Sequence, residues 1–78
     1  MKCPYCDRKP HEITEYVDAA KHEDMTPEEY VRSEEGTFDV RTQLFCCTKC
    51  YIKIGMPLIN ELREAFDYYR SNVEPLEG

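Results

Sequence analysis

The sequence predicts a single small α+β domain, and three observations support this fold class. The chain has 78 residues, about half the length of a typical domain, so we expect one domain over residues 1–78. Helical periodicity and short β-rich runs alternate along it. Two Cys-x-x-Cys pairs lie at residues 3–6 and 47–50. Because so short a chain buries only about 60% of its unfolded surface, it needs a further source of stability, which the cysteines can supply.

The first cysteine pair is predicted to form a turn, and two helices follow it. The apolar residues of the first helix are spaced as one helical face: Ile13, Tyr16, Val17 and Ala20. We expect this helix to end near residues 22–24. Thr26 as N-cap, Pro27 at the first helical position and Glu29 at the third predict the start of a second helix. Gly36 is expected to end that helix as its C-cap.

Short strands are predicted on both sides of the second cysteine pair. Residues 37–40 and 43–46 are β-rich, and we expect them to pair as two strands that turn near residues 41–42. Residues 51–54 alternate in the manner of a strand, which Gly55 would close. These strands are the β part of the predicted fold.

The C-terminal helix is predicted over about residues 57–72, because Pro57 can occupy its first turn. Its apolar stripe consists of Leu58, Leu62, Phe66, Tyr69 and Val73. Tyr68 lies off this stripe, where it is either an ordinary exposed ring or part of a contact surface.

The two Cys-x-x-Cys pairs are the strongest signal in the sequence. Together they supply the four tetrahedral ligands of a closed structural zinc site, which are Cys3, Cys6, Cys47 and Cys50. Residues 7–46 exceed the usual spacer of about 15–20 residues, so they are expected to carry an inserted helical element. The sequence therefore predicts a zinc-ribbon core with two cysteine turns, or knuckles. A two-helix insert would separate the knuckles, the C-terminal helix would pack across them, and each chain would bind one structural Zn²⁺.

A redox site is an alternative interpretation of the first cysteine pair. Cys3-Pro4-Tyr5-Cys6 has the same letters as the active-site motif of glutaredoxins. In that family the motif follows a buried strand and opens a helix, which lowers the pKa of the thiol. Only Met1 and Lys2 precede it here, so we favour the metal site. Disulfides would suit a secreted chain, but there is no signal-peptide segment and two adjacent cysteines suit that framework poorly.

The remaining candidate ligands have simpler interpretations. Cys46 would point away from Cys47 on a strand, so we expect a small buried hydrophobic residue. His11 and His22 are expected on the helix surface, because four sulfur atoms already complete a tetrahedral shell.

Charge is unevenly distributed along the chain. Residues 1–9 and 41–53 carry six basic residues against one acid, whereas residues 10–40 carry ten acids against two bases. The basic residues either offset the charge of metal-bound thiolates, which we favour, or form a phosphate-binding face. The formal net charge of -6 disfavours nucleic acid as a partner, because affinity there comes chiefly from neutralising phosphates.

Several function classes are not expected. No apolar run approaches the roughly 20 residues of a membrane span, so we predict a cytoplasmic protein without membrane contact. A glycine-rich phosphate loop is absent, and a four-sulfur zinc site leaves no open position for water. We therefore expect no enzymatic activity.

Four stretches of sequence carry a resemblance to a known family. They are Cys-x-x-Cys-Asp-Arg-x-Pro-His-Glu-Ile (3–13), Met-Thr-Pro-Glu-Glu-Tyr-Val-Arg (25–32), Glu-Glu-Gly-Thr (34–37) and Cys-Thr-Lys-Cys-Tyr-Ile-Lys-Ile-Gly-Met-Pro (47–57). Over about residues 1–57 the chain resembles the small, largely uncharacterised zinc-ribbon proteins of bacteriophages and mobile elements of actinobacteria. The resemblance implies a phage origin and the same four cysteine ligands. The chain departs from it after Pro57, where such proteins often end in a short tail rich in glycine and proline.

These observations lead to a ranked set of functions. The leading hypothesis is a non-enzymatic zinc-binding module, encoded by a phage, that binds a host or phage protein in the host cytoplasm. Its acidic residues 10–40 and the outer face of its last helix are the expected contact surfaces. The alternative is a DNA-associated transcriptional regulator that uses the basic knuckle face. A thiol oxidoreductase that uses Cys3 and Cys6 is third.

Overall fold

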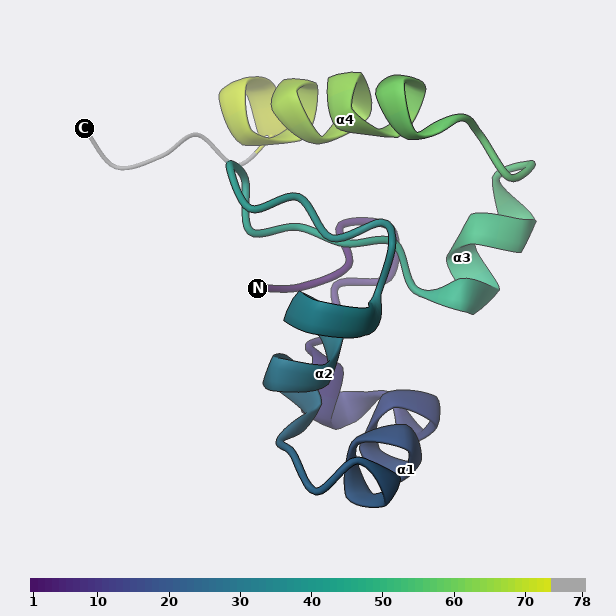
Figure 1. Ribbon diagram of the computed structural model, residues 1–78. Helices are drawn as coiled ribbons and strands as arrows, with labels where there is room; N and C mark the ends of the chain where they lie inside the picture. Colours follow the sequence, from purple (N-terminus) through teal and green to yellow (C-terminus); the bar gives the residue numbers. More distant parts are fainter. Residues whose placement is uncertain (74–78) are drawn as a thin grey trace.

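The computed structural model describes residues 1–73, and within them the chain is mainly helical (Figure 1). Four α-helices follow one another: α1 at Thr14–His22, α2 at Pro27–Glu34, α3 at Thr48–Lys53 and α4 at Ile59–Tyr68. A 3-10 turn at Pro10–Glu12 precedes α1, and a π-helical turn at Tyr69–Val73 extends α4. In Figure 1, α1 and α2 lie together at one end, α4 lies at the other end, and α3 lies at the side between them.

The predicted α+β fold with a zinc-ribbon core is wrong for this part of the chain. Helical residues make up 56% of the described chain and bridge residues 4%, without any sheet. Leu44 forms two isolated bridges, one antiparallel to Asp39 and one parallel to Lys2. The turn predicted near residues 41–42 is present, but it joins single bridges instead of paired strands.

Side chains explain why a ladder does not form between residues 37–40 and 43–46. The Thr37 hydroxyl accepts from the backbone N–H of Cys46 at 2.9 Å and donates to its carbonyl at 3.0 Å. Both backbone groups of Cys46 are therefore satisfied by a side chain, in place of the backbone groups that a strand neighbour would offer. At the turn, Gln43 has a φ of 59°, which is outside the range of an extended strand.

Helices α1 and α2 follow the sequence pattern closely. Tyr16 of α1 is buried, and its ring meets Phe45 edge to face at 5.6 Å, which fixes the helix against the central segment. Thr26 caps α2 through the predicted box, since its hydroxyl accepts from Glu29 N–H at 3.1 Å and the Glu29 carboxylate accepts from Thr26 N–H at 2.9 Å. The predicted C-cap at Gly36 is wrong, because α2 ends earlier and Glu35 is the cap.

The strand predicted at residues 51–54 is also wrong, because these residues belong to α3 or to its end. β-branched Ile52 and Ile54 favour a strand locally, yet Ile54 N–H donates to the Cys50 carbonyl at 2.9 Å, as in a helix. A Schellman motif terminates α3, and its left-handed residue is Gly55, with a φ of 95°. In that motif, Met56 N–H donates to the Tyr51 carbonyl at 2.9 Å. Helical and end-capping hydrogen bonds of the segment therefore override its strand propensity.

The helix predicted over about residues 57–72 is present as α4 and the π-helical turn that follows it, which begin at Ile59 and end at Val73. Leu58 is its N-cap, and the Glu61 carboxylate accepts from Leu58 N–H at 3.0 Å. Leu62 and Phe66 of the predicted stripe are buried. Leu58 is exposed, and the side chain of the last predicted stripe residue, at position 73, lies outside the described part of the structure. No helix among the described residues is both long and apolar enough to cross a lipid bilayer.

Candidate metal centre

The structure brings the four predicted ligands together, although the fold around them differs from a zinc ribbon. Cys3 and Cys6 come from a turn at the start of the chain, Cys47 is the N-cap of α3, and Cys50 lies in the first turn of that helix. Their four Sγ atoms lie within 4.8 Å of one another. The Cys-x-x-Cys spacing thus brings each pair together in two different ways, once in a turn and once at a helix start.

The backbone of the first turn is held in a form that directs both thiols to one side. Asp7 N–H donates to the Cys3 carbonyl at 2.7 Å, and Cys3 N–H donates to the Arg8 carbonyl at 3.0 Å. Asp7 has a φ of 62°, a left-handed conformation in which aspartate is several-fold enriched. Its carboxylate also pairs with the ammonium group of Lys2 at 2.7 Å. The turn is therefore closed by its own residues.

The spacing of the sulfur atoms fits a tetrahedral metal site. The Sγ atoms of Cys6 and Cys47 are 3.8 Å apart. With metal–sulfur bonds of about 2.3 Å, the edge of a tetrahedron is also about 3.8 Å. All five cysteines are free thiols, so the short distances do not come from disulfide bonds. Four soft sulfur ligands in this arrangement suit Zn²⁺ or an iron centre, and hard cations such as Mg²⁺ poorly.

Basic side chains lie directly beside the sulfur atoms. The Arg8 guanidinium donates through Nε to Cys6 Sγ at 3.3 Å, and its Nη2 lies 3.9 Å from Cys47 Sγ. This geometry supports the interpretation that basic residues offset thiolate charge, because four thiolates around a divalent ion leave a net charge of -2. Arg8 is therefore positioned to offset thiolate charge at the site itself.

Cys46 is buried as predicted, but it is not separate from the sulfur cluster. The neighbouring Cys3 thiol, followed by burial, raises the pKa of Cys46, and the proximity of Cys46 lowers the pKa of Cys3. The Cys46 thiol also lies 3.7 Å from the Cys47 carbonyl. Cys46 is therefore a buried neighbour of a candidate ligand, a position that the strand interpretation did not reveal.

The two histidines lie on the surface, as predicted, and outside the sulfur cluster. His11 Nδ1 lies 2.9 Å from a carboxylate oxygen of Glu28, so it links the 3-10 turn to α2. The Cys-Pro-Tyr-Cys motif lies in a turn and does not open a helix, whereas the second cysteine pair does. The structural context of the glutaredoxin motif is thus missing around Cys3 and Cys6.

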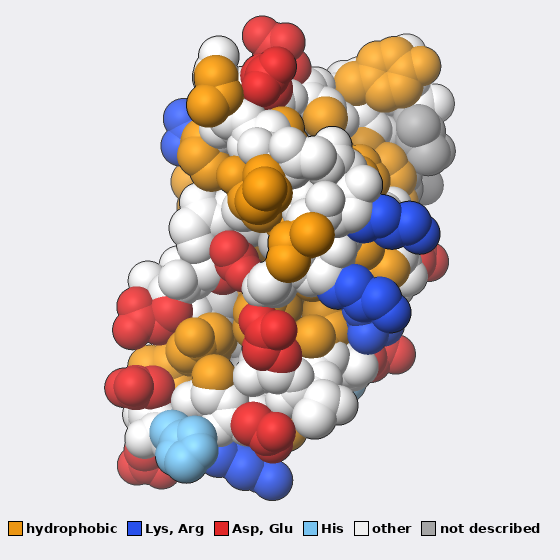
Figure 2. All heavy atoms as spheres, turned by 90° about the vertical axis from the view of Figure 1, so that its right-hand side faces the viewer, with side chains coloured by type: hydrophobic (Ala, Val, Ile, Leu, Met, Phe, Trp, Pro, Cys, Tyr) orange, Lys and Arg blue, Asp and Glu red, His pale blue; other side chains and the backbone are white. Residues whose placement is uncertain are grey.

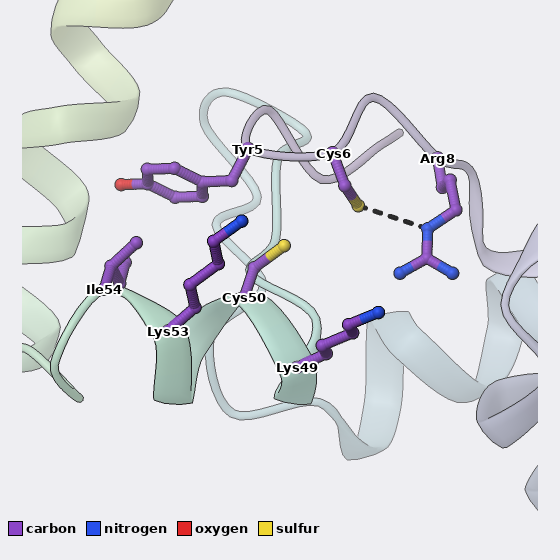
Figure 3. A pocket seen from close by; sticks show the side chains of 7 residues that line it. All are labelled: Tyr5, Cys6, Arg8, Lys49, Cys50, Lys53 and Ile54. Atoms are coloured by element: carbon purple, nitrogen blue, oxygen red, sulfur yellow. Dashed lines mark hydrogen bonds between the residues drawn. The ribbon is translucent and has the colours of Figure 1, made fainter.

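A hollow of about 530 Å³ opens beside the sulfur cluster (Figure 3). The side chains of Lys49 and Lys53 project beside it from α3, and the Tyr5 ring lies across from α3. The lining residues are Tyr5, Cys6, Arg8, Lys49, Cys50, Lys53 and Ile54. The hollow therefore combines cationic and apolar groups next to the candidate ligands.

Comparisons with known proteins identify no relative of this chain. No protein family, no curated protein and no solved structure matches it.

Proposed function

We propose that this protein is a non-enzymatic module that binds one structural zinc ion and presents a surface to a partner protein. The observation that carries the proposal is the convergence of Cys3, Cys6, Cys47 and Cys50 within 4.8 Å. These four residues come from the two ends of a stretch of more than forty residues, so a bound ion would join the start of the chain to α3. The ion would stabilise a fold whose core is small.

Zinc is the metal that we propose because four thiolates form a closed tetrahedral site for it. When bound, the ion supplies structural cross-linking, since four protein ligands leave no position for substrate or water. Cys3, Cys47 and Cys50 are buried, which suits a structural site that exchanges its metal slowly. We place the module in a reducing cytoplasm, where thiols are maintained, and we retain the hypothesis of a phage origin.

Metal analysis of protein purified under reducing conditions tests the proposal. We expect one zinc ion per chain, and a strong chelator should abolish cooperative thermal unfolding, because metal binding free energy is part of the folding free energy. Cys50→Ala should lower the zinc content, whereas a double variant of the exposed histidines, His11→Gln with His22→Gln, should retain it. A reduced, cooperatively folded sample without metal would contradict the proposal. Insulin-reducing activity above that of a zinc-depleted Cys6→Ser variant would favour the oxidoreductase alternative.

A further inference from the structure

Five large apolar side chains lie exposed at the end of α3 and in the segment that leads to α4. Their exposed fractions range from 38% to 67%, and the residues are Ile52, Ile54, Met56, Leu58 and Ile59. They occur within eight consecutive residues, whereas single exposed apolar residues are normally scattered. Figure 2 shows hydrophobic side chains running in a band from the upper left to the centre of the face that carries α3.

The segment that carries these side chains is held in a defined conformation. The Schellman motif fixes the end of α3 at Gly55 and Met56. The Tyr51 hydroxyl donates to the Pro57 carbonyl at 2.8 Å, and the Leu58 N–H is capped by Glu61. Because the backbone is already ordered, a partner that binds here does not have to immobilise it.

Positive charge lies along one side of the apolar band. Residues 41–60 contain three basic residues and no acid, in a chain with 16 acids. Lys49, Ile52 and Lys53 share one face of α3, because they are spaced at i, i+3 and i+4. Neither lysine forms an ion pair with another described residue. The hollow at the metal centre adjoins the band, since Ile54 lines it together with both lysines.

We propose that this apolar–basic surface (Ile52, Ile54, Met56, Leu58 and Ile59 with Lys49 and Lys53) binds an acidic amphipathic peptide segment of a partner protein. Apolar side chains of the segment lie along the band, and an acidic side chain enters the hollow beside the two lysines. The Arg8 guanidinium already donates a hydrogen bond to Cys6 Sγ, so Lys49 and Lys53 are the cations that pair with the carboxylate of the peptide. This inference rests on the proposed function, and it names a surface other than the acidic one that the sequence suggested.

Charge favours a peptide over the other partners that an apolar and basic surface could bind. Anionic membranes and nucleic acids carry dense negative charge, which repels a chain of net charge -6 on close approach, within a Debye length of about 8 Å at physiological ionic strength. The ten acids of residues 10–40 add to that repulsion. A peptide segment with a few acidic residues is repelled only weakly, and burial of its apolar side chains contributes favourable binding free energy.

Selection from a random 16-residue peptide library displayed on phage, against immobilised zinc-loaded protein, tests the proposal. We expect enriched peptides to combine apolar residues at helical spacing with an excess of Asp and Glu. Synthetic versions should bind at least tenfold more weakly to Ile52→Gln with Leu58→Gln, and to Lys49→Glu with Lys53→Glu. The matched control, Val40→Gln with Lys21→Glu, alters an exposed apolar residue and a lysine elsewhere and should bind as the unaltered protein does.

The inference is overturned if no peptide is enriched, or if the selected peptides bind all three double variants equally. It is also overturned if oligo(dT) or phosphatidylserine vesicles bind at physiological ionic strength through these residues while no acidic peptide does. Dimerisation in sedimentation velocity that the Ile52→Gln and Leu58→Gln variant abolishes would assign the surface to a second copy instead. Zinc content is measured in every sample, so a failed selection with zinc retained contradicts this inference alone.

Discussion

Replacing Arg8 with Gln tests whether its contacts with sulfur tune the affinity for metal. The substitution removes the donors that lie 3.3 Å from Cys6 Sγ and 3.9 Å from Cys47 Sγ. Loss of a group that hydrogen-bonds to a metal ligand typically costs about 10–100-fold in metal affinity. Only one of the two contacts is short, and the side chain is partly exposed to solvent, so we expect a loss of about tenfold.

The assay is competition for zinc against a chromophoric chelator at fixed pH and ionic strength. Lys9→Gln is the matched control, because it removes the same charge from the neighbouring position and Lys9 is exposed, without a described contact to the cluster. We expect the control to change the zinc dissociation constant less than twofold. Equal losses of zinc affinity in the two variants would refute a specific role for the Arg8 contacts. The effect would then come from the removal of one positive charge near the site.

Five further substitutions test the ligands, the helix cap and the core in turn. Cys46→Ala should retain zinc and lower the free energy of unfolding by roughly 1–2 kcal/mol, whereas Cys47→Ala should lose zinc. The reverse result in metal analysis would make Cys46 the ligand in place of Cys47. Thr26→Ala should cost about 1 kcal/mol in urea unfolding, because it removes the hydroxyl that caps α2, and an unchanged midpoint would contradict the capping role. Phe66→Ala, in the zinc-loaded protein, should cost about 3–5 kcal/mol and exposed Ile59→Ala less than 1 kcal/mol; equal costs would show that α4 is not packed as described.

The parts of the fold that depend on local chemistry could be predicted from the sequence. The capping box at Thr26 depends on three neighbouring residues, and it appears as expected. The grouping of Cys3, Cys6, Cys47 and Cys50 could be predicted because thiol pairs at this spacing are brought together by a short turn or a helix start. The capping box and each cysteine pair are set by residues within one turn of one another, and the meeting of the two pairs followed from the four ligands that a tetrahedral zinc site needs.

The parts that the apolar and β-propensity pattern does not record could not be predicted. Ile52 and Ile54 have strand propensity, but the Schellman motif at Gly55 and the helix start at Cys47 make their segment helical. The hydroxyl of Thr37 forms hydrogen bonds with both backbone groups of Cys46, where a β-ladder was expected. The periodicity of apolar residues gives no sign of such a side-chain contact. For the same reason the proximity of the Cys46 and Cys3 thiols was not predicted.

X-ray absorption spectroscopy of the zinc-loaded protein at the zinc edge tests the central claim most directly, since it measures the ligand atoms themselves. We predict a first shell of four sulfur atoms at about 2.3 Å, and the loss of one sulfur on replacing Cys50 with Ser. The matched variant Cys46→Ser should leave all four sulfur atoms in place. A shell that includes nitrogen or oxygen atoms at about 2.0 Å in the unaltered protein would contradict a site built from Cys3, Cys6, Cys47 and Cys50.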